Sequence, residues 1–111
     1  MKKDHSFYLR YILESINLIY SYIEEIDEKI FLSSSKHQDM VVRRLEIIGE
    51  AVKHLPDSLK QKYDEVAWKE IAGMRDVLAH EYFGVDYELV WEIIKKELPF
   101  LEETINKMIN E

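Results

Sequence analysis

Isoleucines spaced by four and three residues run through the N-terminal part of this 111-residue chain. Such steps return to one face of an α-helix, so they predict a helix with a narrow apolar seam that must pack against another helix. We expect this helix to begin after Asp4 as its N-cap and to run to about Lys29. The isoleucines of the seam are Ile12, Ile16, Ile19, Ile23, Ile26 and Ile30.

Glycine and proline are scarce, with three and two in the whole chain, which favours helices over a turn-rich β fold. Ser35 and Gln38 have capping-box spacing and predict the start of a second helix. Gly49 lies inside that helix, where glycine costs about 1 kcal/mol relative to alanine. It is either a tolerated defect or, as we favour, a point where another helix approaches closely. The apolar seam of this helix is Val41, Leu45, Ile48, Val52 and Leu55.

The second half of the chain predicts two more long helices. Pro99 must kink or restart the last helix on its way to Asn110, because proline lacks an N–H and clashes with the preceding turn. We therefore expect an all-α fold, an antiparallel bundle of four main helices plus a short helical turn, in one domain covering residues 1–111. The boundary signals are Pro56 before a short turn at 57–62, Trp68 near the start of the third helix, Gly84 as a stop and Asp86 as the next N-cap.

Composition restricts the classes of function. The absence of cysteine excludes disulfides, thiolate zinc sites and cysteine nucleophiles, and together with the lack of a signal peptide or an apolar span it predicts a cytoplasmic protein. The net charge of −7 argues against broad nucleic-acid binding, so no DNA or membrane partner is expected. A nucleic-acid substrate would be held locally by Arg43, Arg44, Arg75 or a few lysines. No metal site is expected from the scattered histidines.

Residues 75–82 place a guanidinium, an imidazole and a phenol within two helical turns. Arg75 and Tyr82 are nearly eclipsed on a helix, and Asp76 and His80 are neighbours four residues apart. Arg75 and His80, however, diverge by about 140° on a regular helix. A long arginine side chain, a helix that loosens before Gly84, or a site completed across a two-fold axis would bring them together. We favour the two-fold axis.

Each of these residues also has a purely structural interpretation. Arg75 could pair with Glu46 or Glu50, as arginines inside bundles usually do. His80 could be a surface histidine oriented by Asp76, and Tyr82 could be a core aromatic. Spacing alone does not decide between these roles.

Residues 75–82 resemble the Arg-x4-His-x-Tyr motif of HepT-type toxins, a family of the HEPN superfamily of helical ribonucleases. Residues 44–51 are similar to the second-helix signature of that family, and residues 68–75 are similar to its lead-in. Residues 82–86, followed by 90–91, are similar to its exit. The resemblance covers essentially the whole chain. Asp76 occupies a position where the family often has asparagine.

The resemblance implies a HEPN-like helical fold and a metal-independent endoribonuclease that acts as a homodimer and needs no cofactor. It implies that Arg75 and His80 are catalytic, with Asp76 in support. It also implies a partner, an MntA-type nucleotidyltransferase antitoxin that transfers AMP to Tyr82 and silences the toxin. The alternative is a noncatalytic helical dimer that acts as an adaptor for a nucleotidyltransferase. A third interpretation is a chain that binds the partner's nucleotide product without cutting RNA.

Overall fold

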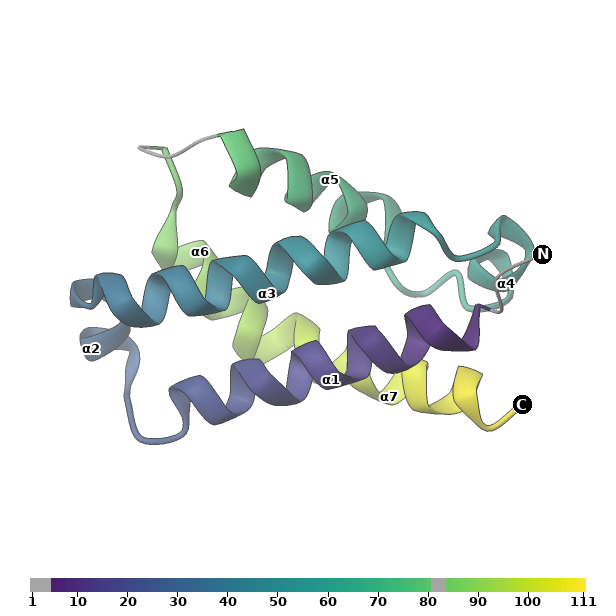
Figure 1. Cartoon of the computed structure of the whole chain (residues 1–111), viewed down its shortest axis with the longest axis horizontal. Coiled ribbons are helices and arrows are strands. Elements are labelled where there is room, and N and C mark those ends of the chain that lie inside the picture. The colour runs from purple at the N-terminus through teal and green to yellow at the C-terminus, as the bar shows by residue number, and fades with distance from the viewer. Residues whose placement is uncertain (1–4, 81–83) are drawn as a thin grey trace.

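The computed structural model describes residues 5–80 and 84–111, apart from the side chains of residues 79 and 80. These residues form seven α-helices and one π-helical turn, and no strand occurs among them. The all-α prediction is confirmed, although the helices are more divided than four main ones. The elements are α1 (Ser6–Ile23), α2 (Glu28–Ser33), α3 (Ser35–Lys53), α4 (Asp57–Lys62), α5 (Trp68–His80), α6 (Tyr87–Glu92), the π turn η1 (Ile93–Glu97) and α7 (Leu98–Ile109), as Figure 1 shows.

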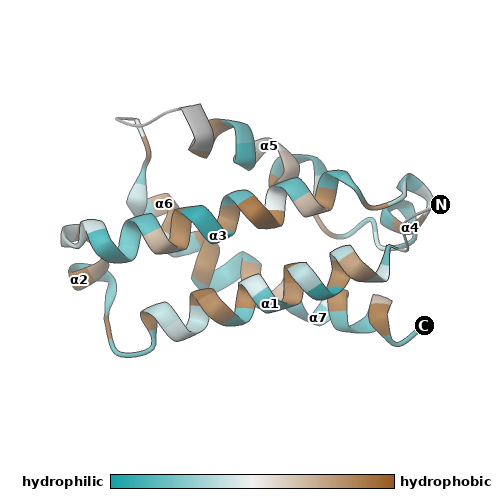
Figure 2. Ribbon diagram, in the orientation of Figure 1, coloured by the Kyte–Doolittle hydropathy of each residue, from teal (hydrophilic) through white to brown (hydrophobic). Residues whose placement is uncertain are grey.

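Helices α1 and α3 run side by side in opposite directions, and each supplies five of the buried apolar side chains of the core (Figure 1). Apolar and polar residues alternate along both helices, as amphipathic packing requires (Figure 2). Each fully buried aliphatic side chain contributes about 1.5–3 kcal/mol relative to an exposed one. Helix α7 packs against α1 and closes the core. The predicted seam of α3 is confirmed, because Val41, Leu45, Ile48, Val52 and Leu55 are all buried.

The first helix ends earlier than the isoleucine spacing predicts. It stops at Ile23, and a separate helix α2 begins after Asp27. The Asp27 side chain accepts a hydrogen bond from the Ile30 N–H at 2.9 Å, so this local cap replaces continuation of the first helix. Ile30 is 44% exposed and does not belong to the core seam. The predicted extension to Lys29 is therefore wrong.

The start of the second long helix is also shifted by one residue. Ser34, not Ser35, is the N-cap of α3, and its hydroxyl oxygen accepts a hydrogen bond from the His37 N–H at 3.3 Å. The Gln38 amide does not close a capping box. It reaches back instead and donates to the Phe31 carbonyl oxygen at 2.9 Å, joining α2 to α3.

The C-terminal helix is interrupted by a π turn just before Pro99, where we expect a kink or a restart. Asp86 caps α6 by accepting from the Leu89 N–H at 3.2 Å, which confirms it as the N-cap. The π turn follows, in which the Leu98 N–H reaches back five residues to the Ile93 carbonyl. Pro99 then occupies the first turn of α7, directly after the π turn.

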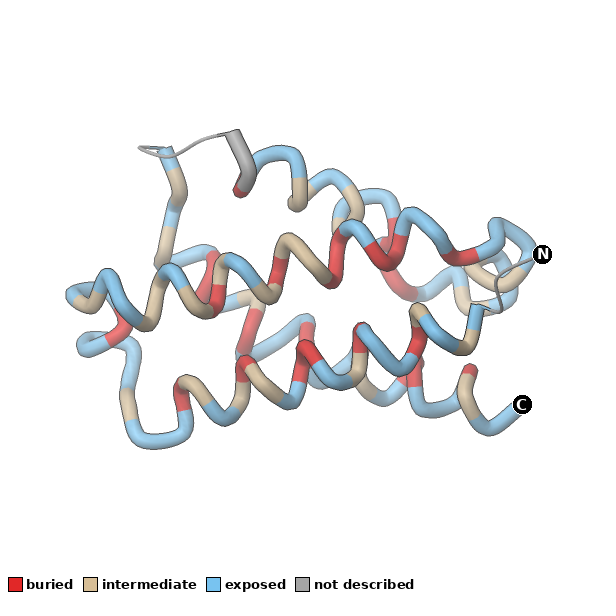
Figure 3. The backbone as a smooth tube through the Cα atoms, in the orientation of Figure 1, coloured by how far each residue is buried: buried red, intermediate tan, exposed pale blue. Residues whose placement is uncertain are grey.

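Helix α5 lies on α3 and is far less enclosed than α1 or α3 (Figure 3). Trp68 and Leu78 are buried, whereas Arg75 is half-buried and Val77 is 54% exposed. None of the described helices combines the length and the apolar character needed to cross a bilayer.

Candidate active site

Helices α3 and α5 touch at Gly49. A Cβ atom added there would lie 2.8 Å from the Arg75 Cβ and 3.0 Å from the Ile71 carbonyl oxygen, too close for any side chain without movement. The expected close approach of a second helix is therefore confirmed, and the helix that approaches is the one that carries Arg75. The contact fixes the start of the Arg75 side chain against the α3 backbone.

Beyond that crossing, the Arg75 guanidinium reaches the surface. Its Nε lies 3.4 Å from the Glu50 Oε1, and its Nη1 donates to the Asp76 Oδ1 at 3.1 Å. The Arg75 side chain is 38% exposed, and the two carboxylates are 49% and 59% exposed. The arrangement is a surface network and not an interior ion pair, so the guanidinium remains accessible to an anion from solvent.

Asp76 has two cationic neighbours in this network, Arg75 and Lys53. The hydrogen bond from Arg75 and the nearby charge of Lys53 lower the pKa of the Asp76 carboxyl below its ordinary value. The Lys53 Nζ lies 3.4 Å from the Asp76 Oδ1, so α3 contacts this carboxylate directly. Asp76 is therefore ionised at neutral pH, and two cations balance the charges of Asp76 and Glu50.

Glu50 connects the network to a second group of side chains. Its Oε2 lies 3.4 Å from the His54 Nε2, one helical turn along α3. The His54 ring stacks on Tyr8 of α1, with centroids 4.8 Å apart and planes 6° from parallel. One carboxylate thus links α5, α3 and the first turns of α1.

The other predicted catalytic residues fall at the limit of the described structure. His80 is the last residue of α5, but its side chain lies outside the description, and so does Tyr82. Helix α5 is continuous from Trp68 to His80, so it does not loosen before His80. The divergence of about 140° between positions 75 and 80 therefore persists in the backbone. The guanidinium of Arg75 and the imidazole of His80 could then meet only through the length of the arginine side chain or across a dimer interface.

The predicted contacts on α3 divide between two roles. Glu50 pairs with Arg75, as one structural interpretation anticipated, whereas Glu46 pairs with Arg43 at 3.5 Å. The Arg43 side chain is 70% exposed, and Arg44 is half-buried. The structure therefore brings Glu50 but not Glu46 to Arg75.

Lys53, His54 and Tyr8 are neighbours of the site that no sequence motif assigns to it. Lys53 follows Glu50 by three residues and shares its helix face, so helical spacing could have suggested it. The position of Tyr8 depends on how α1 lies along α3, which no local pattern reveals.

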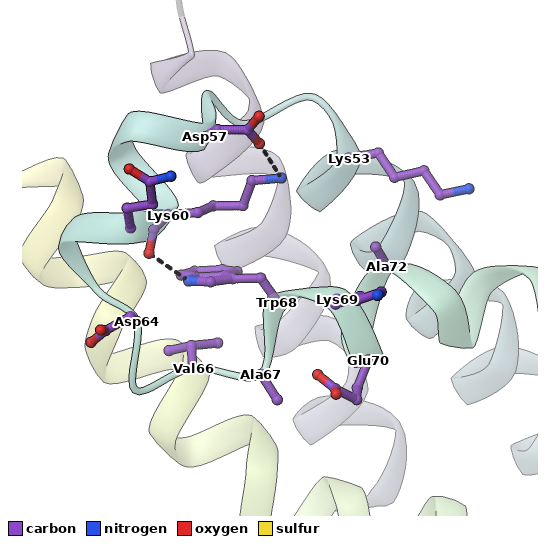
Figure 4. Close-up of a pocket in the computed structure, with 11 residues that line it drawn as sticks. Lys53, Asp57, Lys60, Asp64, Val66, Ala67, Trp68, Lys69, Glu70 and Ala72 are labelled. Carbon is purple, nitrogen blue, oxygen red and sulfur yellow. Dashed lines mark hydrogen bonds and ion pairs between the residues drawn. The ribbon is translucent and has the colours of Figure 1, made fainter.

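A depression of about 680 Å³, which Lys53 helps to line, lies between α4 and the start of α5 (Figure 4). The Trp68 indole donates there to the Lys60 carbonyl oxygen at 3.1 Å, and the Lys60 ammonium lies 3.7 Å from Asp57. The indole hydrogen bond anchors α4 to α5, whereas the ion pair lies within α4. Among the residues that the structure describes, no group of histidines and carboxylates has the arrangement of a metal site.

Comparison with known proteins places the chain in a family. The family described as "Ribonuclease HepT-like" matches residues 12–108. The chain is 44% identical to "Probable ribonuclease HepT" of Thermococcus cleftensis, over 97% of this chain and 98% of that protein. It is 50% identical to "Gamma-glutamylcyclotransferase and putative RNase" of Methanocaldococcus jannaschii, over all of this chain but only half of that protein. No solved structure is significantly similar. The chain belongs to the HepT-like ribonuclease family.

Proposed function

We propose that this chain is a metal-independent endoribonuclease whose cleft is completed by a second copy of itself. The observation that carries the proposal is the placement of Arg75. Gly49 fixes its backbone at the crossing of α3 and α5, while its guanidinium stays accessible at the surface. The same helix carries His80 one and a half turns further on. Relatives named as ribonucleases support this assignment.

The chemistry requires one group that takes a proton and one that gives a proton. The RNA 2′-hydroxyl attacks the adjacent phosphorus, its proton passes to a base, and the bond to the 5′-oxygen breaks as an acid protonates that oxygen. His80 suits both tasks, because the unperturbed imidazole pKa of about 6.5 lies near working pH. Two subunits would supply one neutral and one protonated His80. Asp76, one turn before it, would orient its ring.

Arg75 would stabilise the negative charge that develops on the phosphate oxygens. Its planar fork of donors matches two of those oxygens, and this bidentate hydrogen bonding is stronger than that of a point charge. In the free protein Glu50 and Asp76 occupy those donors. An incoming phosphate would exchange with these exposed carboxylates, while Lys53 would keep Asp76 neutralised.

Regulation by a nucleotidyltransferase fits the same face. Tyr82 lies seven residues after Arg75, so on a continuing helix the two would share a face. AMP attached to the Tyr82 hydroxyl would bring a phosphate to Arg75 and repel RNA. We propose a cytoplasmic toxin–antitoxin pair in which an MntA-like enzyme performs this transfer.

A noncatalytic adaptor is the second candidate, and one observation favours it. Arg75 is already engaged by Glu50 at 3.4 Å, which is what a structural ion pair between α3 and α5 would look like. In this case the dimer would hold a nucleotidyltransferase and cut no RNA.

Incubation of the purified chain with RNA in EDTA tests the proposal. We expect cleavage by the wild type and its loss in His80→Ala, with the circular dichroism spectrum unchanged. Cleavage by His80→Ala at the wild-type rate would remove His80 as the acid–base group. No cleavage by the wild type, with tight binding to the nucleotidyltransferase, would support the adaptor.

AMP transfer needs its own measurement. After incubation with the nucleotidyltransferase and ATP, intact-mass spectrometry should show added AMP on the wild type and none on Tyr82→Phe. An equal level of modification on both proteins would exclude Tyr82 as the acceptor.

A further inference from the structure

A pocket of about 430 Å³ lies between the first turns of α1 and the last turns of α3, next to the Arg75 network. These two helix ends lie side by side at one end of the molecule (Figure 1). We call it the aromatic pocket. It is lined by Phe7, Tyr8, Tyr11, Ile47, Glu50, Ala51 and His54.

Three of the seven residues that line this pocket are phenylalanine or tyrosine, and two of these are exposed. Phe7 is 48% exposed and Tyr11 is 39% exposed. The Phe7 ring centroid lies 5.2 Å from that of Tyr8 and 5.8 Å from that of Tyr11, so the three rings form one cluster. Aromatic side chains of this kind bind flat unpaired bases, because every base presents a π-face.

Glu50 joins the aromatic pocket to the proposed phosphate site. Its carboxylate lines the pocket, and its Oε1 lies 3.4 Å from the Arg75 Nε. In a nucleotide, a single ribose separates the phosphate from the base. A phosphodiester held by Arg75 would therefore have its neighbouring base within reach of Phe7 and Tyr11.

We propose that the aromatic pocket binds the unpaired nucleobase adjacent to the phosphodiester held by Arg75. This inference rests on the proposed ribonuclease function and assigns a base subsite to it. Phe7 and Tyr11 supply the stacking surface. When a phosphate takes over the donors of Arg75, the Glu50 Oε1 is released and accepts a hydrogen bond from a base N–H. Bases in a duplex cannot enter, because their faces and edges are already occupied, so the pocket selects single-stranded RNA.

Binding to an RNA that cannot be cleaved tests the pocket separately from catalysis. The probe is a single-stranded 2′-O-methyl oligonucleotide that contains 2-aminopurine, whose fluorescence falls when it stacks on an aromatic ring. We expect quenching by the wild type and binding about 5-fold weaker for Phe7→Ala, which corresponds to about 1 kcal/mol of stacking. Phe7→Leu retains apolar bulk without the π-face and should show the same loss of quenching.

Phe100→Ala is the matched control, because Phe100 is 38% exposed and lies on α7, away from the aromatic pocket. It should bind and quench like the wild type. Equal binding by Phe7→Ala, Phe7→Leu and Phe100→Ala would overturn the base subsite, even in a protein that cleaves RNA. A dimer that dissociates in Phe7→Ala, with quenching unchanged in Phe7→Leu, would also overturn it and assign the pocket to a subunit interface.

The pocket and the ribonuclease function can fail separately. Quenching that depends on Phe7 in a protein that never cleaves RNA would support the pocket and contradict the nuclease. RNA cleavage that depends on His80 but is indifferent to Phe7, with no quenching by the wild type, would support the nuclease and contradict the pocket.

Discussion

The α1–α3 pair and helix α5 are both amphipathic, but they are enclosed to very different degrees. Ile16 and Ile48 have no exposed surface, and the same holds for the residues nearest to them on the same seams, Ile12, Ile19, Leu45 and Val52. Helix α5 rests mainly on α3, with Arg75 half-buried and Val77 exposed. The first region holds the fold together. The second has room for polar side chains that can exchange partners.

Because of this difference, substitutions in the two regions should have different effects. In the enclosed pair, a lost methyl group leaves a cavity and lowers the free energy of unfolding. On α5, a lost charge removes surface interactions that are individually weak, so stability should change little while function changes a great deal.

Ile48→Ala should lower the free energy of unfolding by about 2–5 kcal/mol, because its fully buried side chain would leave a cavity between α1 and α3. Urea denaturation followed by circular dichroism measures this loss. A loss below about 1 kcal/mol would contradict the assignment of α3 to the core.

Arg75→Ala should reduce RNA cleavage by about 10²–10³-fold, the usual effect of removing a donor that stabilises transition-state charge. Its exposed pair with Glu50 contributes about 0–1 kcal/mol, so the unfolding midpoint should hardly move. Initial cleavage rates and urea curves on the same preparation give both values. Loss of several kcal/mol together with unchanged cleavage would contradict the catalytic role of Arg75 and make its pair with Glu50 purely structural.

Gly49→Ala should lower stability by about 1 kcal/mol, because a strain of about 1–3 kcal/mol at the Arg75 Cβ and the Ile71 carbonyl outweighs the gain in helix propensity. Cleavage should fall as well, since α5 must shift. Gly73→Ala is the matched control, because nothing lies within 4 Å of an added Cβ there. That variant should be stabilised by up to about 1 kcal/mol. Equal shifts in the two unfolding midpoints would contradict the close crossing.

Asp76→Asn should have the smallest effect on the free energy of unfolding, and this effect should depend on pH. The folded-state pKa of Asp76 is lowered by Arg75 and Lys53. Its contribution to stability is therefore complete above the unfolded-state pKa of about 3.9, and it is lost as the pH falls through the lower folded-state pKa. The stability difference between wild type and variant should be present at neutral pH and should shrink at the acid end of the titration. A difference that does not change with pH would contradict this role.

The sequence predicted the features that depend on local periodicity and capping. The buried seam of α3 follows from steps of three and four, and the short helix at Asp57–Lys62 follows Pro56 as expected. Gly49 pointed to a helix crossing because its cost inside a helix needs a reason. Pro99 predicted a kink or a restart, although nothing in the sequence specified a π turn.

The sequence was less informative where several local signals compete or where two helices must align. The isoleucine spacing continues through Ile26 and Ile30 and predicts one long helix, whereas Asp27 caps a separate helix there. Glu46 and Glu50 lie one turn apart on α3, so only the crossing with α5 decides which of them meets Arg75. The register between α1 and α3, which builds the aromatic pocket, is set by the packed core as a whole.

We propose that Arg75 and His80 from paired subunits act on one phosphodiester. Co-expressing wild-type and His80→Ala chains with different affinity tags, and purifying through both tags, isolates the mixed dimer. Its cleft would hold both arginines but only one histidine, so either the base or the acid of the proposed reaction would be missing. We expect its RNA cleavage to be as low as that of the His80→Ala homodimer. A mixed dimer that keeps a large part of the wild-type rate would contradict a shared site, because each subunit would then cleave RNA with its own histidine.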